Sequence, residues 1–171
     1  VQIVQKKFWP KIFEFLDKST LENFCKTSSY KEDKELIKKY SADWRGRFYK
    51  NALGVTFPTS TKEVSKIIKY SNKKNIKLIP QGGNTGLVGG TSPTQNKKEI
   101  KINFEKMNKI IEIDRENRCI EVEAGTIIDN IISAIDKENY LFPLKMSSTG
   151  SSQVGGAIAT NAGGINVVKH G

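Results

Sequence analysis

The spacing of hydrophobic and polar residues along the chain changes near residue 51. Before it, the spacing is helical. In residues 6–16, apolar residues recur mostly every three or four positions with charged residues between them, as in an amphipathic helix. Residues 32–40 are predicted to form a second, shorter helix. We expect the first helix to dock on protein rather than on a membrane surface, because Glu14 and Asp17 interrupt its cationic face. Residues 1–46 are therefore predicted to be an N-terminal helical extension.

After residue 51 the pattern becomes that of a mixed α/β protein. Residues 55–57 form an extended run, and Ser60 stands three positions ahead of Glu63, which is a capping box for a helix over residues 62–74. A short strand is predicted at residues 77–80. The order strand, helix, strand implies a small parallel unit whose ligand loop follows the second strand.

Farther along, the spacing predicts a strand, a hairpin and another helix. Residues 100–103 have strand character, and apolar positions alternate on both sides of the polar turn 115–118, which is typical of a hairpin. Thr126 with Asp129 repeats the capping box, and isoleucines at helical spacing then predict a helix from 127 to about 139.

Composition and charge exclude several classes of protein. The net charge of +10 suggests nucleic-acid binding, but the lysines are spread over all predicted elements among Glu and Asp, so we expect no nucleic-acid partner. No apolar run approaches the roughly 20 residues that span a bilayer. Cys25 and Cys119 lie far apart without a metal-binding motif, so we expect no metal and two reduced packing cysteines. Val1 and Gly171 both look like trimmed ends.

The first glycine-rich segment, residues 80–90, directly follows a predicted strand. Without Cβ atoms in the way, successive backbone N–H groups can converge on an anion, and a diphosphate would suit such a loop. Asn84 and Thr85 add side-chain donors. On spacing alone, a tight surface loop without a ligand explains the glycines equally well. Neither a Walker A motif nor Gly-x-Gly-x-x-Gly is present.

The second glycine-rich segment, residues 150–164, consists almost entirely of small residues. A helix beginning near Gln153 would direct its N-terminal amides at negative charge. Close packing of a helix against a sheet is the alternative, since small residues serve that purpose too.

Together these segments resemble the FAD-linked oxidases with a PCMH-type (vanillyl-alcohol-oxidase-like) flavin domain, in the D-lactate and D-2-hydroxyglutarate dehydrogenase branch. The resemblance covers roughly residues 36–171 and rests on an entry motif (40–46), the loop at 80–90 and Thr-Asn-Ala-Gly-Gly at 160–164, with Met107, Asn108, Glu123, Ala124, Gly125, Phe142 and Pro143 in the expected order between them. It implies an α+β fold: a small parallel α/β subdomain plus a mixed or antiparallel sheet subdomain, incomplete at the C-terminus. The FAD-binding domain would span residues 47–171.

The resemblance also implies which residues contact the cofactor. The first segment would hold the FAD diphosphate, and the second would line its other side, through Gln81, Gly82, Gly83, Asn84, Thr85, Gly86, Leu87, Gly150, Ser152, Gly155, Gly156, Asn161 and Gly163. Relatives with covalent flavin have His where this chain has Asn84, so we expect noncovalent FAD. The catalytic residues are expected downstream of Gly171. His170 matches no catalytic position of the family, and we do not assign it as a base.

The expected function is oxidation of a D-2-hydroxy acid (D-lactate, D-2-hydroxyglutarate or glycolate class) by hydride transfer to FAD, with an acceptor other than NAD. The alternatives are a noncatalytic fragment that lacks the substrate domain, or an FAD-dependent reductase of cell-wall precursor synthesis, against which residues 43–46 argue. Residues 146–149 and 169–170 depart from the family pattern, which weakens the substrate assignment but not the flavin assignment. Cytoplasm and mitochondrial matrix, peripheral membrane association and a homodimer are left open.

Overall fold

The computed structural model describes residues 29–48, 50–94 and 98–170. The helix predicted at 6–16 and the packing role of Cys25 lie outside these residues. The described chain divides into two compact units, each with its own contacts. Unit 1 comprises residues 29–80 and 87–103, and unit 2 comprises residues 81–86 and those from 104 onward.

Unit 1 is built on a three-stranded sheet in the order β1-β3-β2, formed by β1 (Val55–Thr56), β3 (Glu99–Asn103) and β2 (Lys77–Gln81). β1 is parallel to β3, with Val55 beside Lys101. The bonds from Lys77 N to Lys98 O and from Phe104 N to Gln81 O advance in the same direction along both strands, so β2 is parallel to β3 as well. The predicted parallel unit is therefore confirmed.

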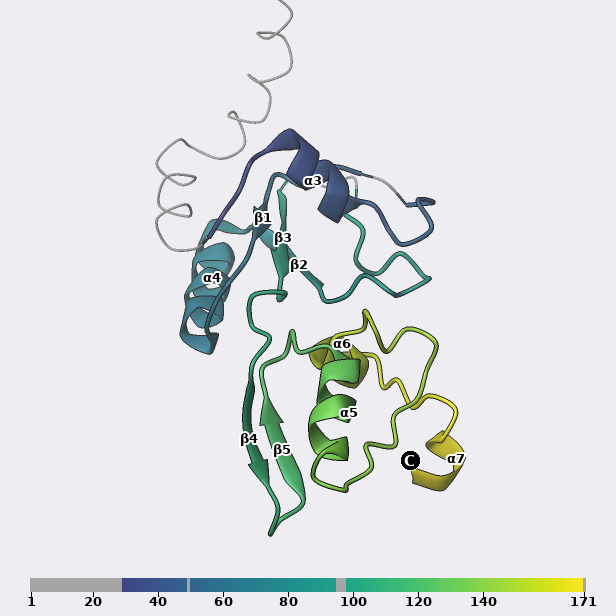
Figure 1. Ribbon diagram of the computed structural model, residues 1–171. Coiled ribbons are helices and arrows are strands. Elements are labelled where there is room, and N and C mark those ends of the chain that lie inside the picture. Colours follow the sequence, from purple (N-terminus) through teal and green to yellow (C-terminus); the bar gives the residue numbers. More distant parts are fainter. Residues whose placement is uncertain (1–28, 49, 95–97, 171) are drawn as a thin grey trace, which may run out of the picture. The chain divides into compact units, whose positions relative to one another are not determined.

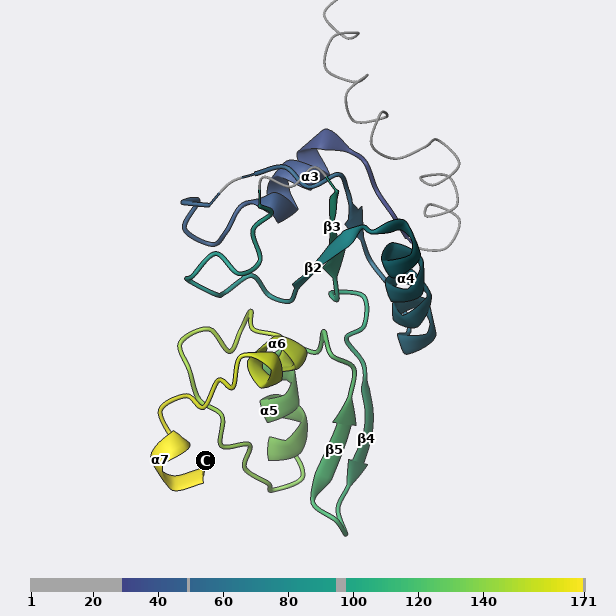
Figure 2. The ribbon, with the colours of Figure 1, turned by 180° about the vertical axis from the view of Figure 1, so that it is seen from behind.

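Two helices complete unit 1, and both were predicted. α3 (Lys34–Ser41) begins at Asp33, whose carboxylate accepts a hydrogen bond of 2.8 Å from Leu36 N. α4 (Thr61–Lys74) lies along one side of the sheet (Figures 1 and 2). Ser60 Oγ caps it by accepting from Glu63 N at 3.3 Å, while the Glu63 carboxylate accepts from Thr59 N at 2.9 Å, one residue earlier than in a standard capping box.

The entry motif forms a turn organised by Asp43. Its buried carboxylate accepts hydrogen bonds from Phe48 N at 2.8 Å and Arg45 N at 3.3 Å. These backbone donors, Phe48 first, hold the Asp43 pKa below its ordinary value of 3.8. The turn thereby positions Phe48, whose carbonyl accepts a hydrogen bond of 3.3 Å from Ser92 Oγ of the same unit.

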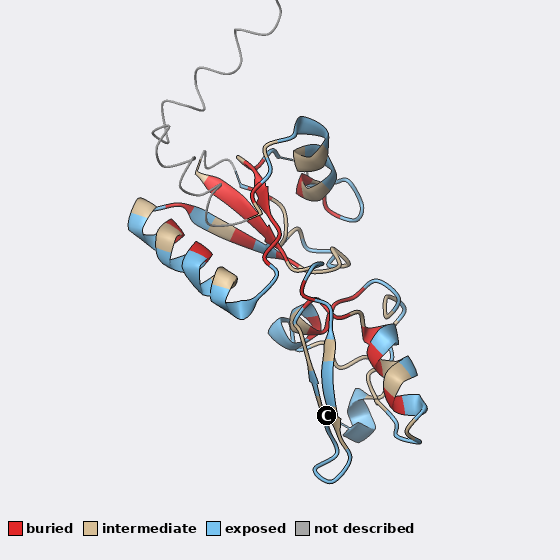
Figure 3. Cartoon of the chain, turned by 60° about the vertical axis from the view of Figure 1, so that its left-hand side comes forward, coloured by how far each residue is buried: buried red, intermediate tan, exposed pale blue. Residues whose placement is uncertain are grey.

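Unit 2 contains the predicted hairpin, β4 (Ile110–Asp114) and β5 (Cys119–Val122), which pair antiparallel with Ile113 beside Ile120. Figure 3 shows that buried residues concentrate in the sheet of unit 1, whereas the hairpin is intermediate or exposed. Cys119 is a free thiol, but it is exposed. The prediction that it packs in the interior was wrong, because β5 carries it on an uncovered face.

α5 (Ile128–Asp136) follows the hairpin, and its predicted cap was wrong. Thr126 Oγ1 donates to the carbonyl of Lys109 at 3.2 Å, and Ile127 occupies the cap position without a side-chain bond. The apolar stripe is confirmed by the burial of Ile128, Ile131 and Ile135. Two short helices end the unit, α6 (Val154–Ala159) and α7 (Val167–His170). Among the described residues, no helix has the length and hydrophobicity of a membrane span.

Candidate functional site

The first part of the glycine-rich loop, residues 81–86, belongs to unit 2 and directly follows β2. We call it the glycine loop. It begins at Gln81, which is buried and whose carbonyl accepts a bond of 3.3 Å from Phe104 N. Asn84 has φ of +55°, a left-handed conformation that asparagine tolerates better than most residues. A left-handed residue is one element of the backbone concavities that bind anions.

The glycine loop lies against residues 150–153, as the predicted site requires. A Cβ atom on Gly83 would overlap the carbonyl oxygen of Ser151, so only glycine permits this approach. The hydroxyls of Thr85 and Ser152 are hydrogen-bonded at 3.0 Å, and Ser152 donates in turn to Ser148 at 2.8 Å. Two segments more than 60 residues apart therefore meet in one unit.

The backbone amides of the glycine loop provide the strongest chemical feature of this site. Within the described residues, the N–H groups of Gly82, Gly83, Thr85 and Gly86 donate no hydrogen bond to another residue. Apart from its two chain neighbours, no other described residue has an atom within 4 Å of a Cβ atom placed on Gly86. Amides that have no partner among the described residues, beside open space, suit an anion such as a diphosphate.

The second segment contributes in another way than predicted. In α6, Val154 N donates to Thr126 O and Gly155 N donates to Ala124 O, both at 2.9 Å. The first two amides of the helix are therefore satisfied by protein, and the expectation that they point at negative charge was wrong for these two. Gly155 serves close packing, because a Cβ atom there would lie 2.8 Å from Ala124 O.

The remaining predicted residues are dispersed. Gly156 is exposed, and a Cβ atom there would meet nothing within 4 Å; Gly163 packs against the Val167 side chain. Asn161 lines a cavity described below, and Gly150 adjoins Ser151 in the segment that contacts the glycine loop. Leu87 is 44% exposed and belongs to unit 1. The structure thus groups residues 82–85 with 150–153, but not with Gly163.

Two residues near the glycine loop were not predicted. Ser148 extends the hydroxyl chain that begins at Thr85. Gln153 is 7% exposed, and its buried Oε1 has no hydrogen-bond partner in the described residues; it would lie 3.3 Å from a Cβ atom on Gly82. The position of Gln153 just before a predicted helix was the one available signal, and it did not indicate burial.

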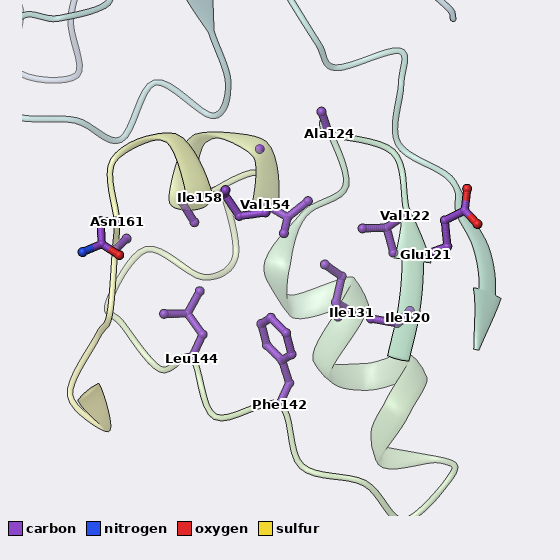
Figure 4. A pocket seen from close by; sticks show the side chains of 13 residues that line it. Ile120, Glu121, Val122, Ala124, Ile131, Phe142, Leu144, Val154, Ile158 and Asn161 are labelled. Atoms are coloured by element: carbon purple, nitrogen blue, oxygen red, sulfur yellow. The ribbon is translucent and has the colours of Figure 1, made fainter. Parts of the chain in front are cut away.

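Unit 2 also contains an apolar cavity of about 730 Å³ between β5, α5, α6 and residues 142–144 (Figure 4). The side chains of Phe142, Leu144 and Ile131 point into it, with Asn161 at its edge. Its polar groups are few, so it differs in chemistry from the glycine loop. His170 lies outside its lining on the exposed helix α7. No cluster of three or more metal-ligating side chains occurs among the residues that the structure describes.

Comparison with known proteins places these features in a family. The model of the FAD binding domain family matches residues 52–171. Mitochondrial D-2-hydroxyglutarate dehydrogenase of Arabidopsis thaliana is 34% identical over 163 residues, which cover 94% of this chain and 29% of the relative. The chain thus spans less than a third of that relative's length.

Solved structures share the fold at low sequence identity. Alkyldihydroxyacetonephosphate synthase aligns with a TM-score of 0.75 and 22% identity, covering 100% of this chain and 32% of that protein. p-Cresol methylhydroxylase aligns with a TM-score of 0.67 and 19% identity, covering 89% and 29%. The α+β, PCMH-type fold is confirmed. Because the family model matches well over half of the sequence, the chain belongs to the FAD-binding-domain family, and its cofactor is FAD.

Proposed function

We propose that the glycine loop binds the diphosphate of FAD, with residues 150–153 as its support. The observation that carries this proposal is the set of amides at Gly82, Gly83, Thr85 and Gly86, which donate to no other residue that the structure describes. Backbone N–H groups at the carboxyl end of a parallel strand are a recurrent means of holding linked phosphates. The open space at Gly86 leaves room for the phosphate oxygens to approach the backbone.

The protein's part in the chemistry is binding and orientation. FAD supplies, when bound, a ring system that accepts a hydride. The Thr85 and Ser152 hydroxyls, joined at 3.0 Å, fix the loop so that its amides need little reorganisation on binding. We expect FAD to remain dissociable, because the carboxamide of Asn84 does not form the covalent bond that a histidine forms.

For the whole protein, we propose oxidation of a D-2-hydroxy acid of the D-2-hydroxyglutarate, D-lactate or glycolate class. Support comes from the relative named a D-2-hydroxyglutarate dehydrogenase, together with the fit of the glycine loop to a dinucleotide. The word mitochondrial in its name supports a matrix location. Substrate-binding groups would come from residues outside this chain, so the 171 residues alone should bind FAD more readily than they turn over substrate.

The binding proposal is tested by comparing Gly86→Val with Gly90→Val. A Cβ atom meets nothing within 4 Å at either position, and neither residue has a left-handed φ, so both variants should fold. We expect Gly86→Val to weaken FAD binding by about a hundredfold, because it fills the space in front of the amides. Gly90→Val should bind normally. Fluorescence titration of FAD measures both, and equal affinities would remove the glycine loop from the site.

The substrate proposal needs the protein as its full gene encodes it. Purified enzyme should reduce a dye acceptor with D-2-hydroxyglutarate, D-lactate or glycolate and should discriminate against the L-isomers of the chiral acids. Acid precipitation should release the flavin into the supernatant. Oxidation of NADPH without any reaction of hydroxy acids would instead favour the reductase alternative, and bound flavin with neither activity would favour a noncatalytic role.

A further inference from the structure

The central strand of unit 1 buries charged side chains where apolar ones would be expected. Every residue of β3 is buried, and Lys101 is completely so. Ile100 and Ile102 share one face of the strand, and by alternation Glu99 and Lys101 share the other. The charged face is covered by residues 87–94, which continue the chain from the glycine loop. We call residues 87–94 the outgoing limb.

Both charged side chains bind the outgoing limb. Lys101 Nζ donates to the carbonyl oxygen of Thr91. The Glu99 carboxylate accepts from Thr94 N at 2.7 Å and from Thr94 Oγ1 at 2.5 Å. Phe48 adds a further contact, because its carbonyl accepts from Ser92 Oγ at 3.3 Å. The limb is thus attached to β3 by the side chains of Lys101 and Glu99, which take no part in the backbone hydrogen bonds of the sheet.

The burial of Lys101 carries a cost in desolvation free energy. Among the described residues no carboxylate lies within 4 Å of its ammonium, and Glu99 is engaged by Thr94. The limb contains no ionisable residue, and Val55 is the neighbour on β1. Burial without a counter-charge lowers the Lys101 pKa from 10.5 to about 8. A methionine of similar volume would fill the same space without this desolvation penalty.

We propose that Lys101 is a positioning residue for cofactor binding: its buried ammonium fastens the outgoing limb through Thr91 and so restricts the glycine loop that the limb continues. Glu99 performs the same role at Thr94. The inference rests on the proposed function of the glycine loop, since restriction matters when the loop amides must order around an anion. An unfastened limb adds conformational freedom that FAD binding then has to remove.

The experiment compares Lys101→Met with Lys69→Met, which makes the same change on the exposed side of α4. Hydrogen exchange of residues 87–94 and fluorescence titration of FAD are measured at pH 7 on the same samples. We expect Lys101→Met to accelerate exchange in the limb and to weaken FAD binding about tenfold, because FAD binding must then order roughly one further residue of backbone. Lys69→Met should change neither. Glu99→Gln should also accelerate exchange, most strongly at Thr94.

The outcomes separate this inference from the function on which it rests. Unchanged exchange in both Lys101→Met and Glu99→Gln overturns the fastening, whatever happens to FAD. Faster exchange with unchanged FAD affinity overturns the positioning role. If the unmodified protein and Lys69→Met bind no FAD, the proposed function fails, while the exchange data still decide whether Lys101 holds the limb.

Discussion

The glycine loop and the outgoing limb are adjacent in sequence, yet different forces hold them. Residues 82–85, in unit 2, are held by steric fit and neutral hydroxyls: Gly83 against Ser151, and Thr85 with Ser152. Residues 87–94, in unit 1, are held by the charged side chains of Lys101 and Glu99. The difference teaches that one continuous segment can be held by two supports of different chemistry. The stability of the support in unit 2 should depend on side-chain size, and that of the support in unit 1 should depend on charge and pH.

The largest effect is expected from Gly83→Ala. A single methyl group would overlap the Ser151 carbonyl, a backbone atom that cannot turn aside, so the glycine loop and residues 150–153 must separate. We expect a loss of about 3 kcal/mol in the free energy of unfolding of unit 2, the upper range for overpacking. Urea denaturation measures it, with Gly90→Ala as the control. If Gly83→Ala lost no more stability than the control, steric fit would not be what holds the glycine loop against residues 150–153.

The pH dependence of unit 1 comes next. The pKa of Lys101 is about 8 when folded and about 10.5 when unfolded, so between these values the unfolded chain keeps a proton that the folded chain has lost. Stability therefore rises with pH over this window, by at most about 3 kcal/mol at 1.36 kcal/mol per pH unit. Denaturation from pH 7 to 11 should show the rise in the unmodified protein relative to Lys101→Met. If the free energy of unfolding changed with pH in the same way in both proteins, Lys101 would not be a buried charge whose pKa is lowered.

Much of the fold was predictable because local patterns decided it. The helical spacing and the Ser60–Glu63 pair located α4 to within one residue at its start, and alternation located the hairpin around residues 115–118. These features need only neighbours in the sequence. The meeting of the two glycine-rich segments was predicted from their joint resemblance to a family, since spacing alone left a simple surface loop equally acceptable.

Two of the failures, the cap of α5 and the first amides of α6, have a common physical cause, which is competition from distant backbone. The Thr126 hydroxyl could have capped α5, but the Lys109 carbonyl, seventeen residues earlier, accepts it instead. The first amides of α6 are taken by Ala124 and Thr126 carbonyls, a contact that no sequence period reveals. The burial of Lys101 and its bond to Thr91 could not be predicted either, because Thr91 comes within reach of Lys101 only in the folded protein.

A smaller effect should come from the hydroxyl pair in unit 2. Thr85→Val keeps the shape of the side chain and removes its bond to Ser152, which retains Ser148 as a partner. We expect the free energy of unfolding to fall by about 1 kcal/mol. A double-mutant cycle with Ser152→Ala should give a coupling of similar size that stays constant from pH 6 to 9, because neither group titrates there. A coupling energy that changes with pH would mean that the hydroxyl pair also depends on a titrating group, contrary to the contrast drawn between the two supports.

The smallest effect, with the opposite sign, is expected from Gly156→Ala. If steric fit explains the glycines of unit 2, then a glycine that touches nothing has no structural reason to be there, and Gly156 is exposed within α6 with open space around its Cβ position. Alanine should therefore stabilise the helix by up to about 1 kcal/mol, whereas the neighbouring Gly155→Ala should destabilise it against Ala124. Thermal unfolding of the two variants tests the contrast. Weaker FAD binding in a more stable Gly156→Ala variant would mean that this glycine is kept for the cofactor, whereas unchanged binding would remove Gly156 from the predicted site.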